Sequence, residues 1–295
     1  MVRVEDKRRQ TVLITGCSAG GIGSALAEAF HKRNLHVFAT SRSPSKMSHL
    51  ENLPNMTLLE LDVTSASSIA SAVVTVMAET GGKLDYLINN SGQALVRPAL
   101  DTDLEQAKGI FDVNLWGMAA VTQAFAPLVI AAKGTIVNNS GLLAVMNMPW
   151  NAFHAASKAA VKTYSETLRL EMAPLGVKVV TLMTGAVGTR LFANCADSEL
   201  PVDSLYTSAS KEIDDMAAGS LLANHVTASV YAKRVVNDVM KGASGMVWRG
   251  KFATTDWFLG TFFPAWFTEW GLKNGSGLSK ISTRPRRVPE EYIEH

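Results

Sequence analysis

Apolar residues recur along most of the chain in two alternating patterns. Short runs rich in β-branched and aromatic residues predict strands, and longer runs with apolar residues at three- and four-residue spacing predict helices. The predicted strands are 11–15, 36–40, 56–61, 84–89, 134–139 and 177–183. The predicted helices between them are 24–34, 66–79, 103–132 and 154–174. A further helix at 228–242 and a strand at 245–249 complete the series.

Alternation of this kind predicts an α/β fold, a doubly wound parallel sheet of about seven strands with helices on both faces. A chain of 295 residues could form one or two domains, but no Pro/Gly-rich linker occurs before Gly271. We therefore expect a single domain over 1–271 and a tail over 272–295, flexible or laid over the surface.

The charge balance, the cysteine count and the length of the apolar runs limit the partners and the location expected for the chain. The 28 basic and 26 acidic side chains nearly cancel, so no field able to hold nucleic acid is expected, and a small molecule is the predicted partner. Cys17 and Cys195 cannot form a disulfide framework, and the polar N-terminus lacks a secretory signal, which predicts a reducing, cytoplasmic location. No uninterrupted apolar run reaches spanning length, and no metal site is predicted.

A glycine cluster, TGCSAGGIGSALAEAF, follows the first strand and opens a helix. Backbone N–H groups at such a helix start can receive a diphosphate, although the same pattern also serves as a tight strand-to-helix turn. Agreement of the flanking elements favours nucleotide binding. The residues assigned to this loop are Gly16, Ser18, Gly21, Ile22 and Gly23.

The ends of the next strands supply further cofactor candidates. The second strand ends in HVFATSR, with Arg42 in the region where an NAD site usually has an acidic side chain. A guanidinium there suits the extra phosphate of NADP(H); a solvated surface arginine is the alternative. Asp62, with Val63 beside it, is assigned to the adenine, and Asn89 and Gly92 to the cofactor.

Taken together, these motifs resemble the short-chain dehydrogenase/reductase family, which implies a Rossmann-like fold. The matching pieces are TGCSAGGIG, LDV, NNSG, the asparagine in FDVNLWG, and SKAA, in the family's order over roughly residues 10 to 190. The glycine loop, the FATSR strand end and the aromatic C-terminal segment are loosely similar to the fungal reductases of acyl-dihydroxyacetone phosphate.

The resemblance implies a catalytic set of tyrosine, serine, lysine and asparagine. Asn114 and Lys158 match the last two, but His154 stands in the tyrosine position, four residues before the lysine. The serine position, thirteen residues before the histidine, is Gly141. Ser140 would serve only if the intervening loop had gained one residue, and both assignments remain open here. Tyr164 lies about 15 Å further along the helix and cannot substitute.

A histidine changes the proton chemistry of this position. Its reference pKa is about 6.5, against about 10 for tyrosine. The charge of Lys158, one turn away, disfavours imidazolium, so a neutral His154 is expected to accept a proton better than it donates one. Proton abstraction is favoured over simple ketone reduction, without excluding reduction.

After the sixth predicted strand the family's PG motif becomes TGAVGTR, in which the resemblance assigns Gly185, Val187 and Thr189 to the nicotinamide. Apolar residues in the adjoining loops predict a lipophilic substrate, although core packing explains any one of them nearly as well. The substrate candidates are Leu142, Met146, Trp150 and Leu191, with Leu143, Val145, Met148 and Phe192 nearby.

The stretch 252–271 carries eight aromatic residues, many at four-residue spacing. It reads equally as a core or dimer-contact helix and as an interfacial segment touching a membrane or lipid droplet, because the basic face typical of interfacial helices is missing. The resemblance also implies a homodimer or homotetramer.

The leading hypothesis is an NADP(H)-dependent oxidoreductase acting on a lipophilic carbonyl or alcohol through an atypical His154, Lys158 and Asn114 site. The first alternative is a non-redox isomerase, dehydratase or cyclase that uses His154 as acid or base. The second is a catalytically silent NADPH-binding regulator.

Overall fold

One seven-stranded parallel sheet forms the centre of the molecule. We describe it from a computed structural model that covers residues 8–189, 191, 199–219, 224–273 and 275–281. The strand order is β3-β2-β1-β4-β5-β6-β9, and every neighbouring pair is parallel, which confirms the predicted doubly wound sheet. The strands are β1 (Thr11–Ile14), β2 (His36–Ser41), β3 (Met56–Glu60), β4 (Tyr86–Asn89), β5 (Thr135–Asn139), β6 (Lys178–Thr184) and β9 (Gly245–Arg249).

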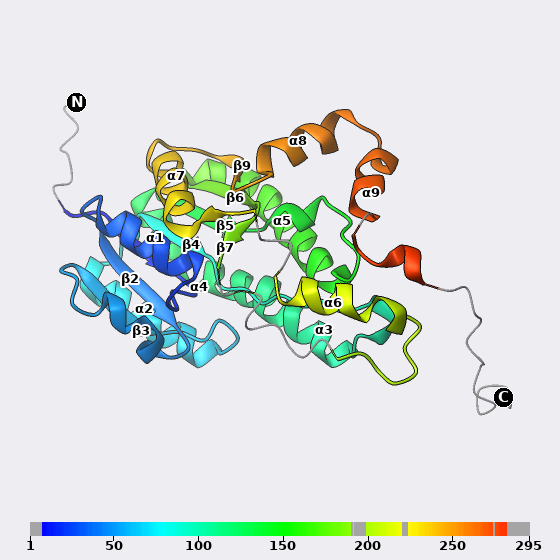
Figure 1. The fold of residues 1–295 in the computed structure, drawn as a ribbon. Coiled ribbons are helices and arrows are strands. Elements are labelled where there is room, and N and C mark those ends of the chain that lie inside the picture. The colour runs from blue at the N-terminus through cyan, green and yellow to red at the C-terminus, as the bar shows by residue number, and fades with distance from the viewer. Residues whose placement is uncertain (1–7, 190, 192–198, 220–223, 274, 282–295) are drawn as a thin grey trace, which may run out of the picture.

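Helices cover both faces of this sheet (Figure 1). The helices α1 (Ile22–His31) and α7 (Ala228–Met240) pack on one face. The opposite face is covered by α2 (Ala66–Thr80), α4 (Met118–Ala132) and α5 (Ala152–Met172). Successive side chains of a strand point to opposite faces, so in β1 Val12 and Ile14 join the first core while Leu13 joins the second.

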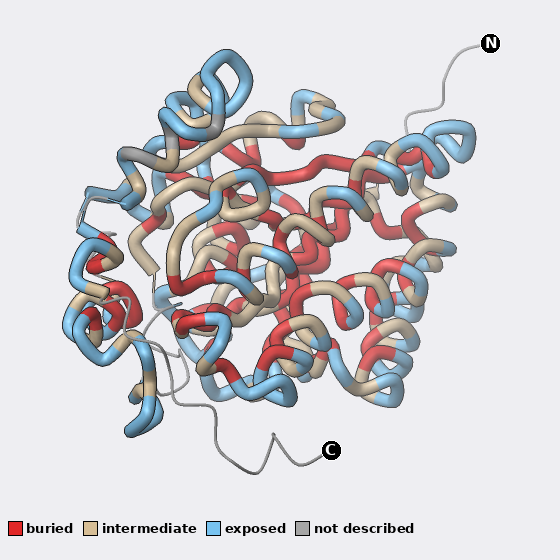
Figure 2. The backbone as a smooth tube through the Cα atoms, turned by 90° about the vertical axis from the view of Figure 1, so that its right-hand side faces the viewer, coloured by how far each residue is buried: buried red, intermediate tan, exposed pale blue. Residues whose placement is uncertain are grey.

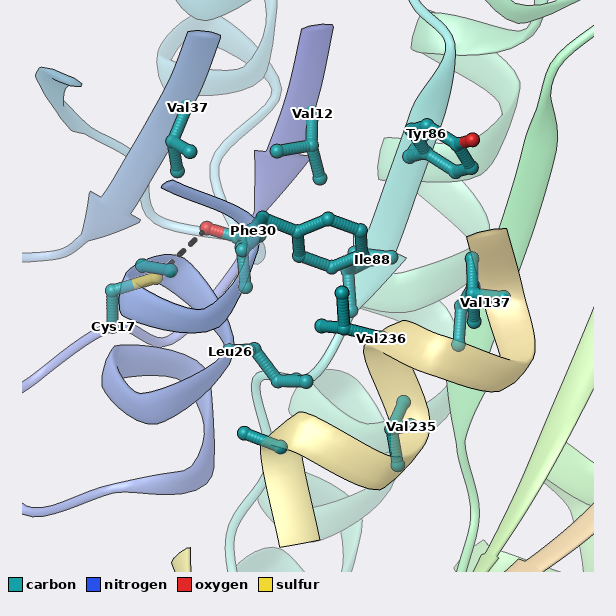
Figure 3. Packing of buried hydrophobic residues seen from close by; sticks show 14 of the residues in the cluster. Val12, Cys17, Leu26, Phe30, Val37, Tyr86, Ile88, Val137, Val235 and Val236 are labelled. Carbon is teal, nitrogen blue, oxygen red and sulfur yellow. Dashed lines mark hydrogen bonds between the residues drawn. The ribbon is translucent and has the colours of Figure 1, made fainter. Parts of the chain in front are cut away.

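Buried residues concentrate in the strands and the inner helix faces (Figure 2). Figure 3 shows part of the first core, where Phe30 and Leu26 of α1 lie near Val235 and Val236 of α7. Cys17 is a fully buried member of this cluster, and burial raises the pKa of its thiol to about 12, so it is an inert packing residue. Cys195 lies outside the described residues.

A single helical run, Leu104–Ala132, joins α3 (Leu104–Phe111), a π-helical turn (Asp112–Gly117) and α4. It is long and apolar enough to cross a membrane by length and composition, with a mean hydropathy reaching 1.6. Val121, Phe125 and Val129 are nevertheless fully buried in the second core, which makes it a core helix of the domain. The π turn places Asn114 in the buried interior, as such turns often do at functional sites.

Several elements were not predicted from the pattern of the sequence. These are the short parallel pair β7 (Val187–Gly188) and β8 (Val226–Thr227), the helix α6 (Ser210–Ala217), and the division of the aromatic segment into α8 (Ala253–Phe262) and α9 (Ala265–Lys273). The start of the predicted tail packs on the body, because the Trp150 indole donates a 2.8 Å hydrogen bond to the carbonyl of Ser276. The remainder, 282–295, lies outside the described residues.

Candidate functional site

The predicted site residues gather where the sheet order reverses. Strands β1 and β4 are neighbours at this switch point, and the glycine loop follows β1 while the NNSG loop follows β4. In doubly wound sheets, ligands bind in the crevice outside the carboxyl ends of the strands at such a point. The two loops therefore lie where doubly wound folds bind dinucleotides.

The glycine loop fits a bound diphosphate. Gly16 has φ +75°, and a Cβ on Gly23 would lie 2.3 Å from the carbonyl oxygen of Gly16. The helix α1 begins after Gly21 without a side-chain cap, so its first N–H groups are open to an anion. The close packing of Gly23 against Gly16 holds the loop on the start of α1 and leaves no room for a side chain.

Arg42 and Asp62 follow β2 and β3 at the same edge. Partial burial raises the pKa of Asp62, but hydrogen bonds from the Thr64 amide and hydroxyl, with the charge of Arg42, lower it below its usual value. Asp62 therefore stays ionised near Arg42. The exposed Arg42 side chain is open to a second anion, while the assigned Val63 is buried against Gly117.

Asn89 faces the interior of the sheet. Its amide donates to Thr122 in α4 and to Asn138 in β5, and its buried Oδ1 has no hydrogen-bond partner among the described residues. Asn90, which sequence reasoning passed over, supports the glycine loop by donating to the carbonyls of Thr15 and Gly16. In a strand, alternate side chains face opposite sides, and only the register reveals which asparagine meets the loop.

His154 is held by a backbone carbonyl. Its Nδ1 lies 2.9 Å from the carbonyl oxygen of Gln93, which also accepts a 3.0 Å hydrogen bond from the Asn114 amide. Because a carbonyl oxygen only accepts, Nδ1 carries the proton, and neutral His154 presents an unprotonated Nε2. Asn114 also accepts from the Gln93 amide at 2.8 Å, so the backbone N–H and C=O of Gln93 are both held by Asn114.

The surroundings of His154 keep it neutral. Burial, followed by the charge of Lys158, lowers the pKa of His154 to about 3, against the hydrogen bond to Gln93. Burial also lowers the pKa of Lys158 to about 8. Lys158 Nζ donates a 2.9 Å hydrogen bond to the Asn139 carbonyl at the end of β5. The site therefore pairs a neutral imidazole with an ammonium group one helical turn away.

Burial of a neutral His154, together with the charge of Lys158, makes the stability of the protein depend on pH. The folded-state pKa of His154 lies below its unfolded value of about 6.5, so the unfolded chain binds the extra proton between about pH 3 and 6.5. The free energy of unfolding should then fall as the pH drops below 6.5. Relative to His154→Asn, the wild type should lose about 2 kcal/mol more between pH 7 and 4.5, measured by urea unfolding. Equal losses in the two proteins would show that His154 is not held neutral.

The hydroxyl of Ser140 is used within the fold. It is buried and donates a 2.8 Å hydrogen bond to the carbonyl of Lys158, on the backbone of α5. Gly141 has φ +133° and ψ 167°, a conformation essentially restricted to glycine. A Cβ there would meet only the Thr184 carbonyl, at 3.6 Å, so backbone conformation rather than space selects the glycine.

Residues 184–189 of the TGAVGTR motif are hydrogen-bonded to the neighbouring strands β5 and β9. Gly185 donates to the Arg249 carbonyl, and a Cβ on it would lie 2.1 Å from the Lys251 carbonyl oxygen. Close backbone packing thus accounts for this glycine. Thr184, in the family's proline position, donates to Asn139 Oδ1 at 2.6 Å, which ties the segment to the residue that holds Lys158. Val187 is buried, and the Thr189 hydroxyl accepts from the Leu191 amide.

The predicted substrate residues do not form one wall. Leu142 and Trp150 are buried, Met146 is half-buried and Leu191 is exposed; Phe192 lies outside the described residues.

A largely apolar groove of about 650 Å³ lies beside the site, between the 143–150 loop, α5 and α9. Ala155 and Ala159 line it, each one position beyond His154 and Lys158, so the groove follows the neighbouring face of α5.

Comparisons with known proteins show the family of the chain. The family described as short chain dehydrogenase matches residues 10–200. The short-chain dehydrogenase ptmH of Penicillium ochrochloron is 46% identical over 271 residues, which cover 92% of this chain and 99% of that protein. The NADPH-dependent 1-acyldihydroxyacetone phosphate reductase of Schizosaccharomyces pombe is 43% identical over 199 residues, 66% of this chain and 67% of that protein.

Solved structures share the architecture. A short-chain dehydrogenase from Streptomyces avermitilis superposes with a TM-score of 0.74 at 26% identity, covering 90% of this chain and 97% of the other. The matched family region contains the glycine loop, the π turn with Asn114, and the helix carrying His154 and Lys158. The chain therefore belongs to the short-chain dehydrogenase family of oxidoreductases.

Proposed function

We propose that the chain is an NADP(H)-dependent oxidoreductase of lipophilic alcohols or carbonyls in which His154 exchanges the substrate proton. The observation that carries the proposal is the 2.9 Å contact between His154 Nδ1 and the Gln93 carbonyl, which leaves Nε2 as a proton acceptor. The buried position of His154 on α5, one turn before Lys158, supports a role at the reacting group.

His154, Lys158 and Asn114 have different roles in the proposed reaction. His154 Nε2 receives the hydroxyl proton of an alcohol and, in reverse, returns it to the oxygen of a carbonyl. Lys158 supplies a positive charge that opposes a lasting imidazolium, so the accepted proton must pass on to solvent. Asn114 fixes the Gln93 peptide that selects the histidine tautomer. The glycine loop and Arg42 would hold NADP(H), whose chemistry would be hydride exchange with the carbon that bears this oxygen.

Arg42 supports the choice of NADP(H) over NAD(H). Its exposed guanidinium follows β2, where the extra phosphate of NADP(H) would meet a planar, permanently charged donor. The relative from Schizosaccharomyces pombe carries the description NADPH-dependent, which is consistent with this assignment. Asp62, held ionised nearby, would remain available to the adenine amino group.

The apolar groove supports a lipophilic substrate. Leu143, Met148 and Trp150 form its loop side, next to the start of α5. Apolar walls with few polar groups favour ligands with little hydrogen-bonding capacity. One test substrate is given by the second relative's description, a 1-acyldihydroxyacetone phosphate, which combines an acyl chain with a ketone.

The test is steady-state turnover, followed by the absorbance of the reduced nicotinamide. Lipophilic alcohols would be supplied with NADP⁺ or NAD⁺, and ketones, including 1-acyldihydroxyacetone phosphate, with NADPH or NADH. We expect turnover with the phosphorylated cofactor, and Arg42→Ala should raise its KM by about tenfold or more, since a charge-assisted pair is worth about 1.5–3 kcal/mol. KM for the unphosphorylated cofactor should change little.

Two results would overturn the proposal. Equal losses for both cofactors in Arg42→Ala would remove the phosphate role. Conversion of a substrate that depends on His154, with no change in nicotinamide absorbance, would replace redox chemistry by base catalysis such as isomerisation. The neutral Nε2 and the absence of a side chain at Gly141 are the features that favour this second function.

A further inference from the structure

The C-terminal aromatic segment, residues 252–273, carries exposed aromatic side chains that do not line the groove beside the redox site. Figure 1 shows α8 and α9 as an arch that projects from the body on the side away from the N-terminus. Phe262 and Trp266, at the bend between the two helices, are 62% and 69% exposed. The other exposed aromatic side chains of the segment are Phe252, Trp257, Phe258, Phe263 and Phe267.

From this arrangement we propose that the aromatic segment inserts into the surface of a lipid bilayer, with the α8–α9 bend deepest. The helices have 10 and 9 residues, or about 15 Å and 13 Å of length, which is too short to cross a hydrocarbon core of about 30 Å. Pro264 separates them at the bend. The size of each helix fits insertion to the depth of the headgroup and acyl boundary.

The direction of the aromatic side chains favours lipid over a protein partner. They occur as adjacent pairs, 257/258, 262/263 and 266/267. Neighbouring positions on a helix point about 100° apart, so each pair within a helix faces two sides. A second protein copy would cover one face, whereas lipid surrounds an inserted segment. Trp and Phe are the side chains that interfacial segments use for anchoring.

The positions of the charged residues also fit an orientation in which the α8–α9 bend lies deepest in the bilayer. No basic residue occurs between Lys251 and Lys273, which stand at the two ends next to the protein body. Lys251 Nζ lies 5.7 Å from the centre of the Phe252 ring, a cation–π arrangement. Both lysines can reach headgroup phosphates while the bend lies deeper. Of the two acids, Asp256 lies in the first turn of α8, and Glu269 pairs with Lys273 at 3.9 Å.

Insertion of the aromatic segment would also bring the apolar groove described above close to the lipid surface. Leu272 of α9 and Leu278 line the groove together with Leu143 of the loop, so the groove opens beneath the inserted helix. A lipophilic substrate dissolved in the bilayer would then reach apolar protein surface without crossing water. This consequence rests on the proposed function, whereas membrane binding itself does not.

The experiment is co-sedimentation of the full chain with vesicles of phosphatidylcholine, alone and with phosphatidylserine. The wild type should bind both, and more strongly with the anionic lipid. Phe262→Ser combined with Trp266→Ser should weaken binding by about tenfold or more, because two large apolar side chains no longer insert. Trp116→Ser is the matched control, since Trp116 is 62% exposed on the π turn away from the segment.

Each outcome decides the proposal. Wild-type binding that the double variant loses and the Trp116 variant keeps supports insertion, provided that the variants show unchanged thermal unfolding and cofactor binding. No vesicle binding by the wild type overturns it, as does undiminished binding by the double variant. If sedimentation velocity shows a dimer that only the double variant disrupts, and vesicles are not bound, the surface is a contact between copies. Loss of membrane binding with retained turnover would leave the redox proposal untouched.

Discussion

His154→Asn should lower turnover by about 10²- to 10⁴-fold, the usual contribution of a positioned general acid or base. The asparagine amide can still donate to the Gln93 carbonyl in place of Nδ1, so the local hydrogen bond is kept while the acceptor Nε2 is lost. The measurement is kcat and kcat/KM on the substrate found in the cofactor panel. Cofactor affinity, measured by nicotinamide fluorescence, should change by less than about threefold because the glycine loop is untouched.

Tyr164→Phe provides the control on the same helix. Tyr164 lies ten residues after His154, about 15 Å along α5, and should leave turnover close to that of the wild type. Retained turnover in His154→Asn would show that the proton reaches the substrate by another group, with Lys158 the next candidate. A loss in Tyr164→Phe equal to that in His154→Asn would indicate a general effect on the helix.

Gly23→Ala should raise the dissociation constant of the cofactor by about 100-fold or more. It should also lower the free energy of unfolding by about 1–3 kcal/mol. Its Cβ would lie 2.3 Å from the Gly16 carbonyl oxygen and 2.7 Å from the Asn90 amide nitrogen. The first of these is backbone, so the loop itself must move. Nicotinamide fluorescence titration and urea unfolding measure the two effects.

Gly109→Ala separates this clash from the general effect of replacing a glycine. Gly109 lies within α3, and a Cβ there meets nothing within 4 Å. Alanine loses less conformational freedom in a helix, so this variant should be more stable by about 0.5–1 kcal/mol. If Gly23→Ala binds the cofactor as well as Gly109→Ala does, the tight loop is not required for the nucleotide.

The elements of the fold follow closely from the sequence. The seven predicted strands correspond to β1 to β6 and β9, with shifts of at most two residues at the ends. In a parallel sheet nearly every strand is buried on both faces, so continuous apolar runs mark the strands, and the 3.6-residue period marks the buried side of each helix. The α6 helix and the β7–β8 pair were missed because they are short and depend on packing between distant segments.

The tertiary structure decided several points at the site that spacing left open. Ser140 and Gly141 are adjacent in sequence, but only the backbone shows that the serine hydroxyl is bonded to α5 while Gly141 adopts a conformation that serine would avoid. Restoring a serine at 141 would therefore strain the loop, so the spacing alone does not identify a simple side-chain exchange. The same holds for Asn89 and Asn90, whose roles differ because they face opposite sides of β4 and its loop.

The sequence by itself determined the family, the sheet, the glycine loop and the presence of His154 at the family's tyrosine position, because local patterns and fixed spacings encode them. It also predicted a neutral imidazole, since Lys158 lies one turn away on the same helix. Only the tertiary structure could select the tautomer, because the Gln93 carbonyl is 61 residues away and reaches His154 through the loop after β4. Likewise, exposure of the aromatic segment depends on where α8 and α9 leave the body, which no local pattern specifies.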